Sequence, residues 1–172
     1  MATREALLAE FDHEVASTRR LLERVPADRL SWTPHQRSRS LGALAAHLAE
    51  IPGWTRHIVD APRFDLDDAV PAALDPEGLL DPHAVEAILH NFDREVALAR
   101  PLLDRGDAEL DALWSLQRSG REIFCVPRAA AVRTLVLGHI VHHRGQLTVY
   151  LRLNEIAVPA IYGPTADTMS AL

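Results

Sequence analysis

Apolar residues recur every three or four positions in four stretches of the chain, which is the spacing of one face of an α-helix. In the first stretch they begin at Leu7 and Phe11 and continue to Val25. The pattern predicts helices over about residues 3–24, 41–59, 82–103 and 129–154. Ser40 precedes the second stretch, where its hydroxyl can accept a hydrogen bond from a free N–H of the first turn, so we expect it to be the N-cap.

Proline, glycine and aspartate mark the breaks in this pattern. The Pro52–Gly53 pair lies inside the second predicted helix and should bend it. The Asp81–Pro82 pair should begin the third helix, as its N-cap and first helical residue. Two long connections remain, over residues 60–82 and 104–128. In the second connection, the segments on either side of Ser119–Gly120 can form a short hairpin.

The fold class expected from these elements is all-α. We predict a single domain over residues 1–172, folded as an antiparallel four-helix bundle with two long connections, one of them holding the short hairpin. The chain is long enough for one sizeable core, since 48% of its 172 residues are hydrophobic.

The charge and the cysteine content indicate which partners the protein can bind and in which cellular compartment it is expected. The net charge is -6 and the chain has no lysine, which disfavours nucleic acid as a partner because phosphate binding needs clustered cations. Cys125 is the only cysteine, so no internal disulfide can form. No apolar run has the length of a signal peptide or of a membrane span. We therefore expect a soluble cytoplasmic protein with no nucleic-acid or membrane partner.

The strongest chemical signal is a pair of histidines, His139 and His143, in an apolar helical stretch. Residues four apart lie on one face of an α-helix, so both imidazoles can point into one cavity and share a metal ion. A tetrahedral catalytic site needs a third protein ligand and keeps one position open. His47 is the best candidate, because it lies within the second predicted helix among small and apolar residues. His142 lies about 100° around the helix from His143 and is expected at the surface or an interface.

Two groups of motifs make the chain resemble the DinB/YfiT-like group of metalloenzymes. The first comprises residues 30–34, 41–47 and Trp54, and the second comprises residues 139–147, 150–154, Pro159 and 162–164. The resemblance runs nearly from end to end, and the His-Arg-Gly-Gln block that begins at His143 is its most specific part. It implies a four-helix bundle with a three-histidine metal site, often assembled as a homodimer. The positions that match the family's ligands are His47, His139 and His143.

The resemblance also implies a kind of activity. Some relatives resemble thiol-dependent transferases or isomerases that use a low-molecular-weight thiol such as bacillithiol or mycothiol. Three imidazoles suit zinc or nickel. A metal with an open position would lower the pKa of a bound thiol or a bound water. We therefore expect a divalent metal cofactor, joined by a low-molecular-weight thiol as cosubstrate if the reaction is a transfer.

Three residues near the predicted ligands are candidates for catalysis or substrate binding. Glu50, three residues after His47, can hold the free ring nitrogen of that histidine or act as an acid or base; a solvated carboxylate is the alternative. Trp54 can form a wall of the substrate pocket, or pack only in the core. Arg144 can bind an anionic group of the substrate, or be solvated or paired at the helix surface.

The function predicted from these residues is that of a metal-dependent enzyme, a thiol S-transferase or a hydrolase that acts on a small molecule. The main alternative is a non-catalytic protein, either a metal-stabilised dimeric bundle or a stress-response binding protein. A structural metal site normally has a protein ligand in its fourth position. No cysteine near these helices supplies one, which favours an open site.

Overall fold

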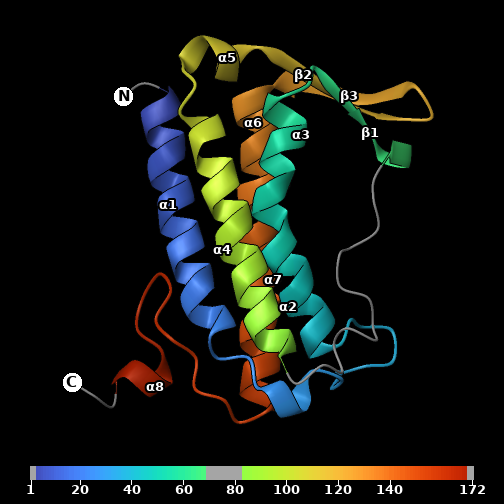
Figure 1. Cartoon of the computed structure of the whole chain (residues 1–172). Helices are drawn as coiled ribbons and strands as arrows, with labels where there is room; N and C mark the ends of the chain where they lie inside the picture. Colours follow the sequence, from blue (N-terminus) through green and yellow to red (C-terminus); the bar gives the residue numbers. More distant parts are fainter. Residues whose placement is uncertain (1–2, 69–82, 170–172) are drawn as a thin grey trace.

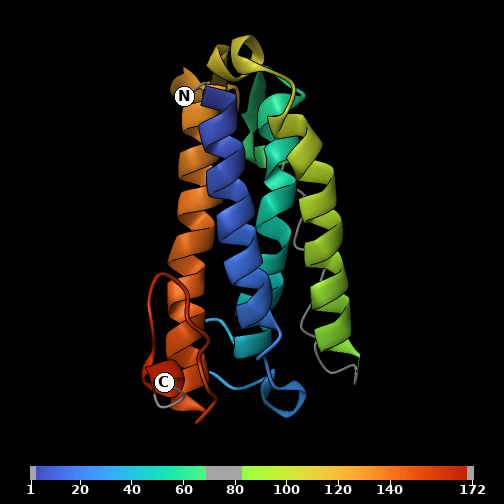
Figure 2. The ribbon, with the colours of Figure 1, turned by 90° about the vertical axis from the view of Figure 1, so that its left-hand side faces the viewer.

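The computed structural model describes residues 3–68 and 83–169, which form a helical body with a small sheet at one end (Figure 1). Four helices provide most of the length of the body: α1 (Thr3–Leu22), α2 (Leu41–Glu50), α4 (Ala84–Leu103) and α7 (Gly138–Leu153). They run side by side, and the C-terminal tail with the short helix α8 (Ala166–Met169) lies against the end far from the sheet (Figure 2).

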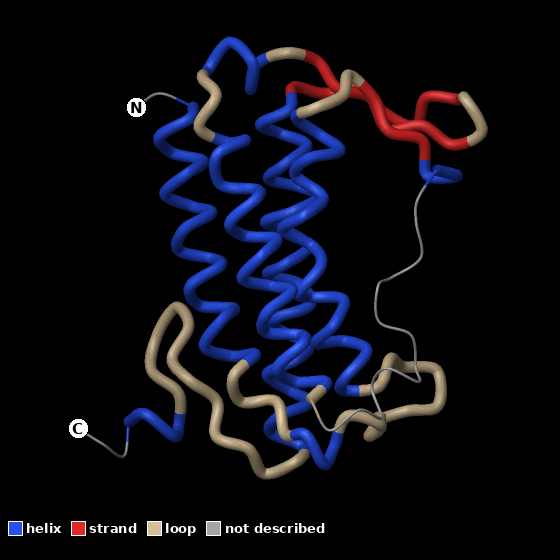
Figure 3. Tube along the Cα trace, in the orientation of Figure 1, coloured by secondary structure: helices blue, strands red, loops and turns tan. Residues whose placement is uncertain are grey.

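The expected all-α class is wrong, because three strands form a mixed sheet in the order β1-β2-β3 (Figure 3). Strand β1 (Arg63–Asp65) pairs in parallel with β2 (Leu113–Arg118), and β2 pairs antiparallel with β3 (Arg121–Pro127). The β2–β3 pair is the hairpin predicted around Ser119–Gly120. The protein is therefore an α/β structure and not a simple four-helix bundle.

Strand β1 was not predicted because it owes its conformation to a distant partner. It has three residues, too few to show alternation, and Arg63 pairs with Ser115 from the other long connection. The Asp65 carboxylate fixes this arrangement by accepting hydrogen bonds from the backbone N–H groups of Ser119 (3.1 Å) and Gly120 (2.7 Å). The hairpin turn and β1 thus stabilise each other.

Two of the predicted helices are divided into shorter elements. The second becomes α2, a 3-10 turn η2 (Ile51–Trp54) and α3 (Thr55–Val59), which begins after the Pro52–Gly53 pair. The last becomes α6 (Arg128–Val132), a π-helical turn η5 (Arg133–Leu137) and α7. The remaining short helices, which were not predicted, are η1 (Ala27–Arg29), η3 (Leu66–Asp68), α5 (Asp107–Asp111) and α8.

Of the two predicted N-caps, one lies in the described part of the chain. The Ser40 side chain accepts a hydrogen bond from the backbone N–H of Ala43 (3.2 Å), which confirms it as the N-cap of α2. The Asp81–Pro82 pair lies outside the described residues.

The core lies between the long helices, which each contribute a buried apolar face. Its members include Leu7 and Phe11 of α1, Leu44 and Leu48 of α2, Ile88 and Phe92 of α4, and Ile140 and Leu147 of α7. In residues 3–68 and 83–169, no helix has the length and apolar character needed to cross a membrane.

The bend after α2 brings the backbone of Gly53 against α4. The neighbouring side chain there is Glu95, which is only 5% exposed and pairs with Arg56 (3.0 Å) and Arg94 (2.8 Å). A Cβ placed on Gly53 would lie 2.1 Å from Oε2 of Glu95. The absence of a side chain therefore permits η2 to pack on α4, and η2 ends at Trp54.

Gly53→Ala should lower the free energy of unfolding by about 1–3 kcal/mol, because the new methyl group displaces a buried, ion-paired carboxylate. Chemical denaturation measures this change. Gly145→Ala in α7 is the matched control, since its Cβ would meet nothing within 4 Å and alanine favours a helix interior. Equal stability of Gly53→Ala and the unaltered protein would contradict the close approach described here.

Candidate metal centre

His139 and His143 lie one turn apart on α7 and point to the same side of the helix. Their Nε2 atoms are 2.8 Å apart. This closeness follows from the four-residue spacing, which stacks side chains on one helical face. Both side chains are half-buried.

His47 reaches the same place from α2. Its Nε2 lies 3.2 Å from Nε2 of His139, and the candidate ligand atoms of the three histidines all lie within 4.8 Å of one another. The structure thus brings together the three residues that the sequence indicated as metal ligands. Among the described residues, no other histidine, cysteine, aspartate or glutamate belongs to this cluster.

The spacing of the nitrogens suits a divalent metal ion. Two nitrogens that bind one zinc ion at about 2.0–2.1 Å with tetrahedral angles are about 3.4 Å apart. The two Nε2 separations that involve His139, 3.2 Å and 2.8 Å, are close to this value. A metal bound here would have three imidazole ligands and a further position for a small molecule, because all three side chains remain partly exposed.

The three imidazoles are neutral at physiological pH, as metal ligands must be. Burial lowers the pKa of His47 and the pKa of His139 from 6.5 to about 4, and neighbouring positive groups add to the effect. Burial also lowers the pKa of His143. Each ring therefore offers a lone pair without first losing a proton.

Gln146 orients His143, a role that the sequence analysis did not assign. Its Oε1 lies 2.7 Å from Nδ1 of His143 and can accept only a hydrogen bond, so Nδ1 carries the proton. Nε2 then keeps its lone pair and faces the other two histidines. The spacing of three residues on one helix was the available signal, because it places Gln146 beside His143.

Trp54 lies beside two of the three histidines. Its ring centroid is 5.6 Å from that of His47 and 4.9 Å from that of His139, in edge-on contacts. The indole is half-buried. It therefore borders the cluster on the side where α2 ends, a position that suits the predicted pocket wall.

The two candidate catalytic residues are not brought into the cluster. Glu50 is half-buried at the end of α2 and is not one of the grouped metal-binding side chains. Arg144 is 1% exposed and pairs with Glu14 of α1 (2.5 Å). It also donates a hydrogen bond to the hydroxyl of Tyr162 in the C-terminal tail (2.6 Å). These contacts give Arg144 a structural role away from the imidazoles.

His142 is exposed and lies outside the cluster, as expected from its direction on the helix. Its ring centroid is 4.8 Å from that of His143, so it is a neighbour of the site.

Comparison with known proteins identifies the family. The model of the DinB family matches residues 1–170. A DinB-like protein from Bacillus cereus ATCC 10987 has a similar structure, with a TM-score of 0.65 and 22% sequence identity over 92% of this chain and 97% of that chain. A DinB-like protein from Bacillus subtilis is similar with a TM-score of 0.65 and 16% identity, over 92% of this chain and 99% of the other.

No curated protein matches the chain. The likeness to the two solved structures extends to the fold alone. The three-histidine cluster is compatible with a metal-binding protein of the DinB type. Because the family model covers nearly the whole chain, the protein belongs to the DinB family.

Proposed function

We propose that this protein is a metal-dependent enzyme that acts on a small molecule at the three-histidine centre, as a thiol S-transferase or as a hydrolase. The observation that carries the proposal is an incomplete donor set: three neutral imidazoles converge, and no fourth metal-binding side chain of the described residues joins them. A purely structural site would close that position with a protein ligand. This argument disfavours the alternative of a metal that only stabilises the fold.

Each residue of the centre would have its own role in such a site. His47, His139 and His143 would hold the metal, and Gln146 keeps His143 in the tautomer whose Nε2 is free. When bound, a divalent ion such as zinc or nickel supplies a Lewis acid that lowers the pKa of a thiol or a water in its open position. Trp54 provides an apolar surface against which a substrate can lie.

Thiol transfer is the first reaction to test, because the sequence motifs resemble those of thiol-dependent relatives.

We also propose a homodimer on the basis of the same resemblance. The outer face of α7 supports it by exposing Val149 (56%) and Leu153 (57%).

Small thiols should shift the visible spectrum of the cobalt-substituted protein, because a thiol that enters the open position becomes a ligand of the metal. Titration with a low-molecular-weight thiol and with imidazole measures this shift. A response to thiols supports transfer, and a response to imidazole alone moves the proposal to hydrolysis. The absence of any spectral response would contradict the open coordination position and favour a structural metal.

His143→Ala should lose the bound metal, whereas His142→Ala should keep it, because only His143 presents Nε2 to the cluster. Replacing one ligand of three should weaken metal binding by at least about a hundredfold, the upper end of the loss seen for outer groups of metal sites. Metal analysis of untagged protein after dialysis gives the stoichiometry. Equal loss in both variants would show that the ligands have been assigned wrongly.

The metal-free protein should become less stable as the pH falls from about 6.5 to about 4. The unfolded chain binds protons on its imidazoles below about pH 6.5. In the folded protein, burial holds the pKa of His47 and the pKa of His139 at about 4. The unfolded state thus binds more protons in this window, and the free energy of unfolding decreases with decreasing pH.

Denaturation of the metal-free protein at a series of pH values measures this slope. The double variant His47→Gln/His139→Gln is the control and should have a shallower slope. An unchanged slope in the double variant would show that these two imidazoles are not the cause.

A further inference from the structure

One end of the metal centre lies next to the loop that precedes α2. Ser40, the N-cap of α2, is seven residues before His47, and Tyr150 is seven residues after His143 on α7. Seven residues complete almost two turns of an α-helix and span about 10 Å, so each residue lies on the same face as its histidine. Arg39 joins the two helices at this level, because the Tyr150 hydroxyl donates a hydrogen bond to its carbonyl oxygen (3.3 Å).

The loop holds this position through several contacts with α2 and α7. The Trp32 carbonyl accepts a hydrogen bond from the backbone N–H of Leu41 (2.8 Å), and the Leu30 carbonyl accepts one from Gly42 (2.9 Å). The Trp32 ring packs edge-on against Tyr150, with centroids 5.5 Å apart. These contacts fix the backbone of Arg39 at the start of α2, about two helical turns before His47. The arginine side chain is long enough to extend from there toward the histidines.

The positive charge of Arg39 acts on every imidazole of the cluster. Burial is the largest cause of the lowered pKa of His47, of His139 and of His143, and the charge of Arg39 contributes to each. The side chain is exposed, and none of the ion pairs among residues 3–68 and 83–169 includes it. A guanidinium in this place disfavours a divalent cation unless an anion lies between the two charges.

We propose that Arg39 binds the anionic group of the ligand whose other end occupies the open position of the three-histidine centre. The ligand is then a small molecule that carries a carboxylate or a comparable anion, and this inference rests on the proposed function of the same site. Arginine suits this role because its planar guanidinium donates two parallel hydrogen bonds to a carboxylate.

The position of Trp54 indicates how the ligand would be oriented in the site. It follows His47 by seven residues, whereas Ser40 precedes His47 by seven, so the indole and Arg39 lie toward opposite ends of the centre. An anionic group would bind at the loop before α2, and an apolar group would lie against the indole. The two ends together fix the orientation of the ligand.

The test compares 3-mercaptopropionate with 3-mercapto-1-propanol, which have the same length but only one of which carries a carboxylate. Titrated into the cobalt-substituted protein, the carboxylate should bind about tenfold more tightly, the gain of one charge-assisted hydrogen-bonded contact. Arg39→Gln should abolish this preference. It should bind cobalt at least as well as the unaltered protein, because a nearby positive charge is removed.

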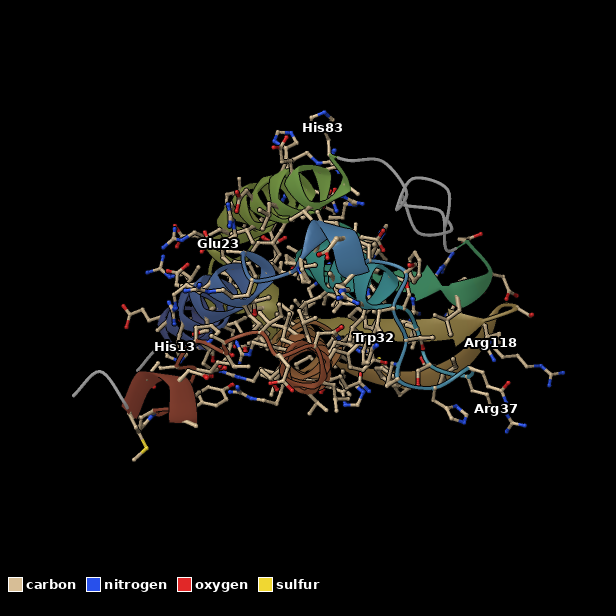
Figure 4. The ribbon with its side chains drawn as sticks, turned by 90° about the horizontal axis from the view of Figure 1, so that it is seen from below. His13, Glu23, Trp32, Arg37, His83 and Arg118 are labelled. Atoms are coloured by element: carbon tan, nitrogen blue, oxygen red, sulfur yellow. The ribbon has the colours of Figure 1, made fainter. Side chains whose placement is uncertain are left out.

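Arg37→Gln is the matched control and should keep the preference. Arg37 belongs to the same loop but lies at the edge of the molecule, with its side chain pointing away from the helical body (Figure 4). Its charge is not among the causes of the lowered pKa of any of the three histidines.

Succinate and succinamide separate this inference from the thiol reaction, since neither contains sulfur. If no thiol binds but succinate binds in an Arg39-dependent manner, thiol transfer is overturned and the anion site stands. Equal preferences in the unaltered protein and in Arg39→Gln, or no binding of either carboxylate, would overturn the role of Arg39. A protein that holds no cobalt would overturn the metal centre itself.

Discussion

The side-by-side packing of α2 and α7 is the constraint on which the candidate site depends. His47 and His139 are 92 residues apart in the sequence, yet their Nε2 atoms lie 3.2 Å apart. A histidine side chain is short, so it cannot compensate for a large displacement of its helix. Metal ligands generally have to be held within about 0.5 Å of their working positions. The shared core of the long helices provides this precision, because a close-packed interior resists small shifts.

Packing alone does not determine how α7 is rotated about its own axis, and Arg144 supplies this second restraint. It follows His143 directly and points to a different side, where it is buried against Glu14 and Tyr162. A rotation of α7 would separate the Arg144 guanidinium from the Glu14 carboxylate, which is costly because a buried charge would be left without a partner. The ion pair with α1 therefore helps to aim the histidines toward α2, and the C-terminal tail takes part through Tyr162.

The sequence was most informative where a feature depends on neighbouring residues. The spacing of His139 and His143, the cap at Ser40 and the hairpin at Ser119–Gly120 are all local and were predicted. The pairing of β1 with β2 was missed because it depends on contacts between distant segments. The spacing of residues along α7 gives the direction of the Arg144 side chain but does not show which distant residues it meets, here Glu14 and Tyr162. For this reason Arg144 was predicted to lie at the site. Arg39 was missed for a different reason, since it lies in a loop whose position depends on contacts with the distant residue Tyr150.

The direction in which α7 presents its histidines depends on the number of residues in the π-helical turn η5. In this turn the backbone N–H of Gly138 donates to the carbonyl of Arg133, five residues earlier, in place of the usual four. A π turn therefore accommodates one residue more than an α-helical turn. Deletion of a single residue between Arg133 and Leu137 would restore a regular α-helix and rotate all of α7 by about 100° relative to α6. Such a deletion would leave the histidine motif intact in the sequence but point it away from α2, so the motif forms the cluster only together with the extra residue of the π turn.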